Sequence, residues 1–264
     1  MRWVILSLII VAAGCSIVPT TFTPAEPIPA DEFSHRLLSR VLEAHVSNGV
    51  VDYPGIQVDD RLPAYLAQLE RVDPNAFVMR NERLAFWINA YNAFAIKGIL
   101  DHYSPVSYVG RYRYFIGRDY RVGGASINLY DLERQVLIKQ FHEPRIHFAI
   151  VCASMSCPKL QTWVYEPDQL ERQLDRVARD FINDPTRNRF NRTQKVASLS
   201  MIFKWFDDDF TRVAGSVLTY ITHYVNDPEL VQDLMRSEYR IEYLDYDWSL
   251  NGISPKEPSH AGQS

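Results

Sequence analysis

The sequence predicts one α+β domain in which a mixed or antiparallel sheet packs around a buried central helix. Helical and strand-like patterns follow one another along the chain, which is typical of this class. The segment 81–103 is apolar on nearly every helical face, which predicts a buried, central helix. No internal repeat or linker divides the chain after residue 31. A chain of 264 residues, 47% of them hydrophobic, can bury one substantial core.

The spacing of apolar residues predicts each element in turn. It indicates helices at 33–48, 60–69, 81–103, 127–141, 166–182 and 212–225. It indicates strands within 108–122 before a Gly123-Gly124 hairpin turn, in the apolar run 146–152, and within 195–203 and 239–251. Asn89 and Asn92 lie three residues apart on the predicted central helix. Their amides therefore need hydrogen-bond partners if that helix is buried.

The first residues are typical of a secretory signal. In "MRWVILSLIIVAAGCS", Arg2 precedes an apolar run that is too short to span a bilayer. The segment Ala12-Ala13-Gly14-Cys15 resembles a bacterial lipobox. The resemblance implies removal of residues 1–14, lipidation of Cys15 with palmitate, and, with Ser16 next, an outer-membrane lipid anchor facing the periplasm. The alternative is a plain secretory signal that contains a cysteine.

The remaining boundaries follow from composition. Residues 15–30 are rich in proline and threonine and predict a lipidated tether, followed by one globular domain over 31–252 and a tail over 253–264. The formal charge of −4, with both signs interspersed, argues against a nucleic-acid partner. Because the charge is also not basic, the expected membrane contact is through the lipid on Cys15 and not through surface charge. No glycine-rich phosphate loop occurs, and no cofactor is expected.

Cys152 is the candidate nucleophile. It ends the apolar run "IHFAIVC", where a strand would pass into a loop, and His147 precedes it. In a continuous strand these two residues would point to opposite faces about 16 Å apart, so His147 could serve Cys152 only if the strand breaks. His223 is the other candidate base. The alternatives are a buried structural cysteine or a disulfide between Cys152 and Cys157, which an envelope compartment permits.

Two further clusters carry charge. Asp207, Asp208 and Asp209 are consecutive and lack the spacing of a calcium loop, so no metal is predicted. Asp209 could instead orient a histidine or cap the helix that follows. The segment "GRYRYFIGRDYR" could grip an anionic glycan, a carboxylate-bearing peptide or another envelope partner, or could be an ordinary hairpin with its arginines in water. Its arginines are Arg111, Arg113, Arg118 and Arg121.

Six motifs, in order, carry a family resemblance: "LAFWINAYNAFAIKGIL", "INLYDLER", "IHFAIVCASMSCPKL", "LERQLDRVARDFIN", "WFDDDF" and "YDWSLN". Over residues 35–251 the chain resembles the domain-of-unknown-function family number 547. Typical members carry histidine where this chain has Arg134, after Glu133. The family implies no particular activity.

A weaker similarity is to cysteine-protease and transglutaminase-like folds, with Asn89, His147 and Asp209 in the order nucleophile, histidine, acid. Asparagine is not a nucleophile, so this analogy implies either a relocated thiol, Cys152, or a non-catalytic relative.

Two functional hypotheses follow. The first is an envelope lipoprotein with a non-catalytic binding or scaffolding role. The second is a thiol-dependent peptidase or amidase in which Cys152 attacks an acyl group and His147 or His223 is the base.

Overall fold

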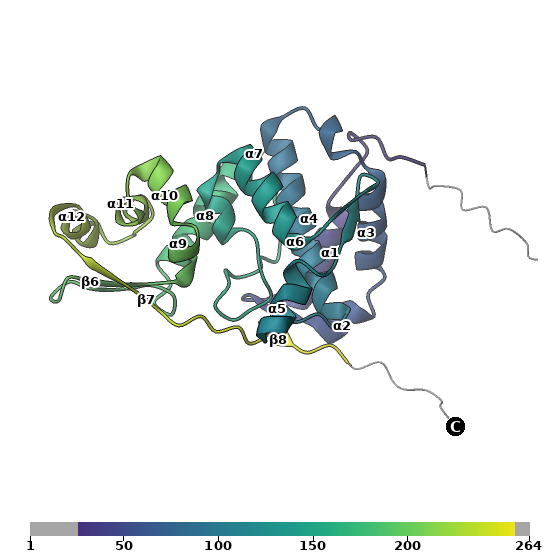
Figure 1. Ribbon diagram of the computed structural model, residues 1–264. Coiled ribbons are helices and arrows are strands. Elements are labelled where there is room, and N and C mark those ends of the chain that lie inside the picture. The colour runs from purple at the N-terminus through teal and green to yellow at the C-terminus, as the bar shows by residue number, and fades with distance from the viewer. Residues whose placement is uncertain (1–25, 257–264) are drawn as a thin grey trace, which may run out of the picture.

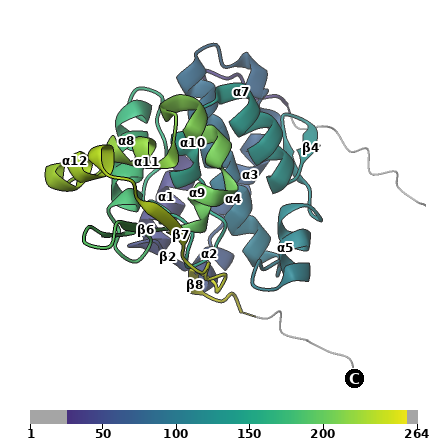
Figure 2. The same cartoon turned by 60° about the vertical axis from the view of Figure 1, so that its left-hand side comes forward.

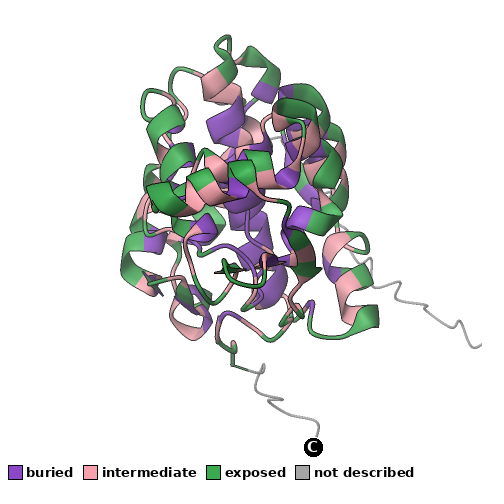
Figure 3. Cartoon of the chain, turned by 90° about the vertical axis from the view of Figure 1, so that its left-hand side faces the viewer, coloured by how far each residue is buried: buried purple, intermediate pink, exposed green. Residues whose placement is uncertain are grey.

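The computed structural model describes residues 26–256, so the predicted signal peptide and Cys15 lie outside the described residues. The N-terminal part is helical and leads to one long helix, α4 (Figure 1). Its elements are α1 (Arg36–His45), β1 (Val46–Ser47), β2 (Val50–Asp52), α2 (Tyr53–Gln57), α3 (Arg61–Arg71), η1 (Pro74–Ala76) and α4 (Arg80–Leu100). Most residues of α4 are buried, which confirms the predicted central helix. Figure 3, coloured by burial, shows the buried residues gathered in the middle of the molecule and the exposed ones around them.

The middle of the chain is more helical than predicted. It contains α5 (Tyr108–Phe115), β3 (Tyr120–Val122), β4 (Ala125–Ile127), α6 (Leu129–Asp131), the π-helix η2 (Leu132–Ile138), α7 (Lys139–Phe141) and the 3-10 helix η3 (Pro144–Phe148). The prediction of a strand at 108–115 is wrong: the side chain of Ser107 accepts a hydrogen bond from the Gly110 amide and caps a helix there. The hairpin turn at Gly123-Gly124 is confirmed, because β3 and β4 pair antiparallel around it.

The last part of the chain alternates helices and strands. It contains α8 (Leu170–Ile182), β5 (Arg189–Asn191), β6 (Val196–Leu199), α9 (Met201–Trp205), α10 (Asp207–Ala214), α11 (Val217–Thr222), α12 (Pro228–Arg236), β7 (Arg240–Tyr243) and β8 (Gly252–Ile253). The predicted helix 212–225 is interrupted at Gly215, whose φ of 81° ends α10 in a left-handed cap.

The sheets are small and mixed. β2 pairs antiparallel with β1 and parallel with β8, and β6 pairs antiparallel with β5 and parallel with β7. After β7 the chain runs back across the molecule to reach β8 beside β2 (Figures 1 and 2). These elements confirm a single α+β domain with mixed sheets. Among residues 26–256, no helix has the length and apolar character needed to cross a membrane.

The predicted strand at 146–152 is wrong. Residues Pro144–Phe148 form a 3-10 helix, and the residues after it join no sheet. The run is apolar because it is buried, and a buried run without a neighbouring strand must satisfy its backbone in another way. The side chain of Asn92 does so: its amide nitrogen donates to the carbonyl of Ala149 and its oxygen accepts from the amide of Val151, both at 3.0 Å.

Candidate thiol active site

One cavity of about 190 Å³ holds the predicted nucleophile and its predicted base. Cys152 and His147 both line it, together with Glu133 and Arg134 from η2. Aromatic side chains make up much of the remaining wall: Tyr91, Phe115, Tyr130, Trp205, Phe206, Tyr246 and Trp248. Polar, titratable groups thus converge in a mostly apolar cavity, which is the usual character of a ligand or active site.

Two amides on α4 fix the segments that form the site. Asn92 binds the backbone on either side of Ile150, as described above, and so places Cys152. One turn earlier, Asn89 donates to the carbonyl of Tyr165 at 2.8 Å and accepts from its amide at 2.9 Å. The predicted need for partners at both asparagines is confirmed.

The loop after Cys152 is held by the C-terminal segment. Ala153 has a φ of 58°, an uncommon conformation for a residue with a β-carbon, and its carbonyl accepts from the amide of Asn251 at 3.1 Å. The amide of Met155 donates to the carbonyl of Ser249 at 2.8 Å. The loop therefore stays in a strained turn because residues about a hundred positions later hold it there.

The Cys152 thiol has hydrogen-bonding groups on several sides. Ser154 Oγ and the Tyr246 hydroxyl each lie 3.2 Å from its sulfur, and the Cys152 amide donates to Cys157 Sγ at 2.8 Å. Burial alone would raise the pKa of Cys152, but hydrogen bonds with Cys157, Ser154 and Tyr246 outweigh it and lower the pKa to about 7. Burial raises the pKa of Cys157 well above its usual value. Of the two cysteines, Cys152 is therefore the one that ionises to a thiolate at the lower pH.

Both cysteines are free in this structure, and Cys152 is partly exposed to solvent while Cys157 is buried. A disulfide between them stays a prediction, and the mass measurement described below tests it.

The "WFDDDF" segment surrounds His147, which is only 3% exposed. Phe206 stacks on the imidazole with ring centroids 3.8 Å apart, and Phe210 meets it edge-on at 5.5 Å. Nε2 of His147 lies 2.8 Å from Oδ2 of Asp209, whose other oxygen pairs with Arg212. Burial would raise the pKa of Asp209, but hydrogen bonds from His147 and Arg212 lower it overall. The predicted role of Asp209 in orienting a histidine therefore agrees with the geometry.

An ionised Asp209 fixes the tautomer of His147. A carboxylate only accepts hydrogen bonds, so Nε2 carries the proton and Nδ1 keeps its lone pair. Nδ1 is buried and has no hydrogen-bond partner among residues 26–256. Burial lowers the pKa of His147, hydrogen bonding to Asp209 opposes this, and the positive charges of Arg134 and Arg212 lower it further. A neutral imidazole with a free Nδ1 can act as a base.

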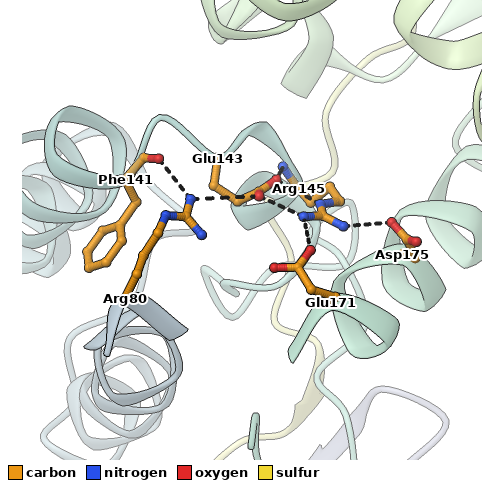
Figure 4. A network of polar contacts seen from close by, with 6 residues as sticks. All are labelled: Arg80, Phe141, Glu143, Arg145, Glu171 and Asp175. Carbon is orange, nitrogen blue, oxygen red and sulfur yellow. Dashed lines mark hydrogen bonds and ion pairs between the residues drawn. The ribbon is translucent and has the colours of Figure 1, made fainter. Parts of the chain in front are cut away.

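A network of ion pairs anchors the 3-10 helix that carries His147 (Figure 4). The guanidinium of Arg145 donates to both oxygens of Glu143 at 2.7 Å and, at the same distance, to Glu171 and Asp175 on α8. Arg145 and Glu143 are only 14% and 11% exposed, so solvent screens their pair less than an ordinary surface pair. The network joins η3 to α8 two residues before the imidazole.

Residues 76–182 match a family model described as "Protein of unknown function, DUF547". Over this segment, which is less than half of the chain, the sequence is similar to that family. The matched segment contains Asn92, Glu133, His147 and Cys152, whereas Asp209 and Tyr246 lie after it. No curated protein and no solved structure matches the chain.

Other predicted site residues lie away from this cavity. His223 follows α11, where its Nδ1 lies 3.3 Å from the Tyr220 carbonyl oxygen, and it lines a different pocket beside His142. The structure therefore does not bring His223 to Cys152. Asp207 and Asp208 are exposed. Within the described residues, no group of three or more His, Cys, Asp or Glu side chains is placed to hold a metal ion.

The four predicted arginines do not form one site. Arg118 pairs with Asp101, and Arg121 pairs with Glu70 at 2.7 Å. Arg113 lies near the ring of Tyr103, 5.9 Å from its centroid. Of the four, only Arg111 approaches the cavity: its guanidinium lies over Trp248, 4.6 Å from the ring centroid, in a groove that shares Trp248 with the cavity.

Glu133 is a site residue that sequence reasoning did not select. It lies in the π-helix, a form that often marks functional sites, but π-helices have no simple sequence pattern. Tyr91 donates to Glu133 at 3.5 Å. Burial raises the pKa of Glu133 to about 7; the charge of Arg134 opposes the rise and the Cys152 thiolate adds to it. Glu133 thus holds a proton well above its ordinary pKa.

We expect Glu133→Gln to stabilise the protein at alkaline but not at acidic pH. Between pH 4.5 and about 7 the folded protein keeps a proton that the unfolded chain has lost, so stability falls as pH rises through this window. Glutamine removes that dependence. Relative to the native protein, the free energy of unfolding of the variant should be higher by on the order of 2 kcal/mol at pH 8 and almost unchanged at pH 4.5. Urea unfolding at both pH values checks this. Glu238→Gln, an exposed position, is the control, and an equal gain at both pH values would contradict the assignment.

Proposed function

We propose that this protein is an envelope lipoprotein whose domain is a thiol-dependent acyl-transfer enzyme of the peptidase or amidase type. The observation that carries the proposal is the common cavity of Cys152 and His147, in which the thiol has a lowered pKa and the imidazole is oriented by Asp209. Nucleophile, base and orienting group are the three parts that covalent acyl transfer needs. The N-terminal lipobox-like segment supports the location, and lipid at Cys15 would hold the enzyme at the membrane.

The chemistry proceeds in two steps. In the first, His147 Nδ1 takes the proton of the Cys152 thiol as Sγ attacks the carbonyl carbon, and it passes this proton to the leaving amine as the bond to that amine breaks. The product is a thioester on Cys152. In the second, His147 takes a proton from water as the water attacks the thioester, which releases a carboxylic acid and restores the thiol. Asp209 stabilises the charged imidazole in both steps and is a positioning residue.

The first experiment asks whether Cys152 forms an acyl adduct. The purified domain is incubated with an activated ester, p-nitrophenyl acetate, and the adduct is located by peptide mass mapping; we expect it on Cys152. Alkylation by iodoacetamide should occur at Cys152 with half-maximal rate near pH 7, below the value of about 8.5 for a free thiol. Buried Cys157 is the internal control and should react only after unfolding.

The same mass spectra test the alternative, a non-catalytic binding or scaffolding role. A quantitative Cys152–Cys157 disulfide in the native protein would contradict the enzymatic proposal, because an oxidised sulfur cannot attack a carbonyl carbon. Ester hydrolysis that persists unchanged in Cys152→Ser would contradict it as well.

A further inference from the structure

Arg134 is a cation in the cavity without an anionic partner. It lines the cavity and is half-buried, and no hydrogen bond or ion pair of its guanidinium occurs within residues 26–256. Its charge lies 4.8 Å above the centroid of Phe206 and 5.8 Å from that of Tyr130. This cation–π contact with Phe206 leaves the guanidinium N–H donors free to bind an anion.

Two other partly buried arginines, Arg145 and Arg61, are paired with carboxylates. Arg145 contacts three carboxylates, and Arg61 donates to both oxygens of Asp59 at 2.6 to 3.1 Å. The one carboxyl beside Arg134 in the cavity is Glu133, which lies beyond ion-pair distance and, with its pKa raised to about 7, is largely neutral below that pH. Arg134 is therefore arranged unlike a structural arginine: its charge faces space that a ligand can enter.

We propose that Arg134 binds a carboxylate of the substrate, so that the site selects acyl compounds carrying a carboxylate next to an apolar or aromatic group. A guanidinium offers two parallel N–H donors that match a carboxylate in planar geometry. The aromatic side chains of Trp205, Tyr246 and Trp248 supply the apolar part of the cavity. The catalytic meaning of this selection rests on the proposed acyl-transfer function, but carboxylate binding does not.

The binding test uses the whole chain with Cys152→Ala, so that no thiol chemistry interferes. Titration with 3-phenylpropionate and with its neutral amide, followed by tryptophan fluorescence and calorimetry, measures the preference for the carboxylate. We expect the acid to bind at least about 10-fold more tightly than the amide, and the ratio of acid to amide affinity to fall to about 1 in Arg134→Gln. Arg134→Lys should keep part of it, since it retains charge but loses the planar fork. Arg172→Gln, on the exposed face of α8, is the matched control.

A second measurement separates this inference from the proposed function. The rates at which iodoacetate and iodoacetamide alkylate Cys152 are measured in the native chain and in Arg134→Gln. The first reagent carries a carboxylate and the second does not. The iodoacetate-to-iodoacetamide rate ratio, in which any change common to both reagents cancels, should fall about 10-fold in Arg134→Gln. A reactive Cys152 with the same ratio in both proteins overturns the role of Arg134 and leaves the enzyme proposal standing. If Cys152 is inert but acid binding depends on Arg134, the role of Arg134 stands and the enzyme proposal is overturned. Absence of carboxylate binding, or equal loss in Arg172→Gln, overturns the inference directly.

Discussion

Replacing Asp209 with asparagine should reduce Cys152-dependent ester hydrolysis by about 10³-fold or more while the fold is retained. The reason is the direction of one hydrogen bond. Oδ1 of Asp209 faces Arg212, and Oδ2 faces His147. An asparagine must turn its oxygen toward the cationic Arg212, so its NH₂ group points at Nε2 of His147. Nε2 then becomes an acceptor, and the proton moves to Nδ1, the nitrogen that must accept it from the thiol or water.

The measurement is the rate of p-nitrophenyl acetate hydrolysis, corrected for the Cys152→Ala background. Asp208→Asn is the matched control, since it makes the same change one residue earlier on the exposed side of α10. Circular dichroism confirms that both variants are folded. A folded Asp209→Asn variant with activity within 10-fold of the native protein would show that His147 does not work through this carboxylate.

The second large effect is expected at Asn92. Asn92→Ala leaves a buried carbonyl at Ala149 and a buried amide at Val151 without partners, and should lower the free energy of unfolding by about 3 kcal/mol. It should also free the segment before Cys152. The thiol then loses its fixed position against Ser154 and Tyr246, and its pKa should rise from about 7 toward the value of about 8.5 of a free thiol.

Asn89→Ala separates stability from the site. It removes the same two kinds of hydrogen bond from the same helix, but at Tyr165 rather than at the segment before Cys152. We expect similar destabilisation by urea unfolding in both variants, and an altered pH profile of Cys152 alkylation only in Asn92→Ala. If both variants shifted the profile equally, the change would reflect general loosening of the core.

Hydrophobic spacing predicted the elements whose backbone groups form hydrogen bonds within the same helix or hairpin. The central helix, the amphipathic helix later assigned as α8 and the glycine hairpin follow from local patterns, and the structure contains all three. The run 146–152 could not be predicted in this way, because its backbone partner is the side chain of Asn92, more than fifty residues earlier. An apolar run without polar alternation is buried, but the pattern does not say which neighbour bonds to it.

The site was predicted in its residue types and not in its assembly. Cys152, His147 and Asp209 were candidates because of their chemistry, yet only the folded chain shows that His147, and not His223, shares a cavity with the thiol. Glu133 and Arg134 were noted only as a departure from the family pattern. Nothing in "DLERQV" indicates a π-helix or the cavity beside it, since both depend on packing against α4.

The return of the C-terminal chain to the cysteine loop also sets an order of events during synthesis. Cys152 leaves the ribosome 94 residues before Tyr246, whose hydroxyl helps to lower the pKa of the thiol. Until those later residues have emerged and docked, the thiol lacks its hydrogen bond with Tyr246, and the loop after it lacks the backbone hydrogen bonds with Ser249 and Asn251. The thiol therefore gains the hydrogen bond that helps to lower its pKa in the same late step that brings Tyr246 and Trp248 in as walls of the cavity.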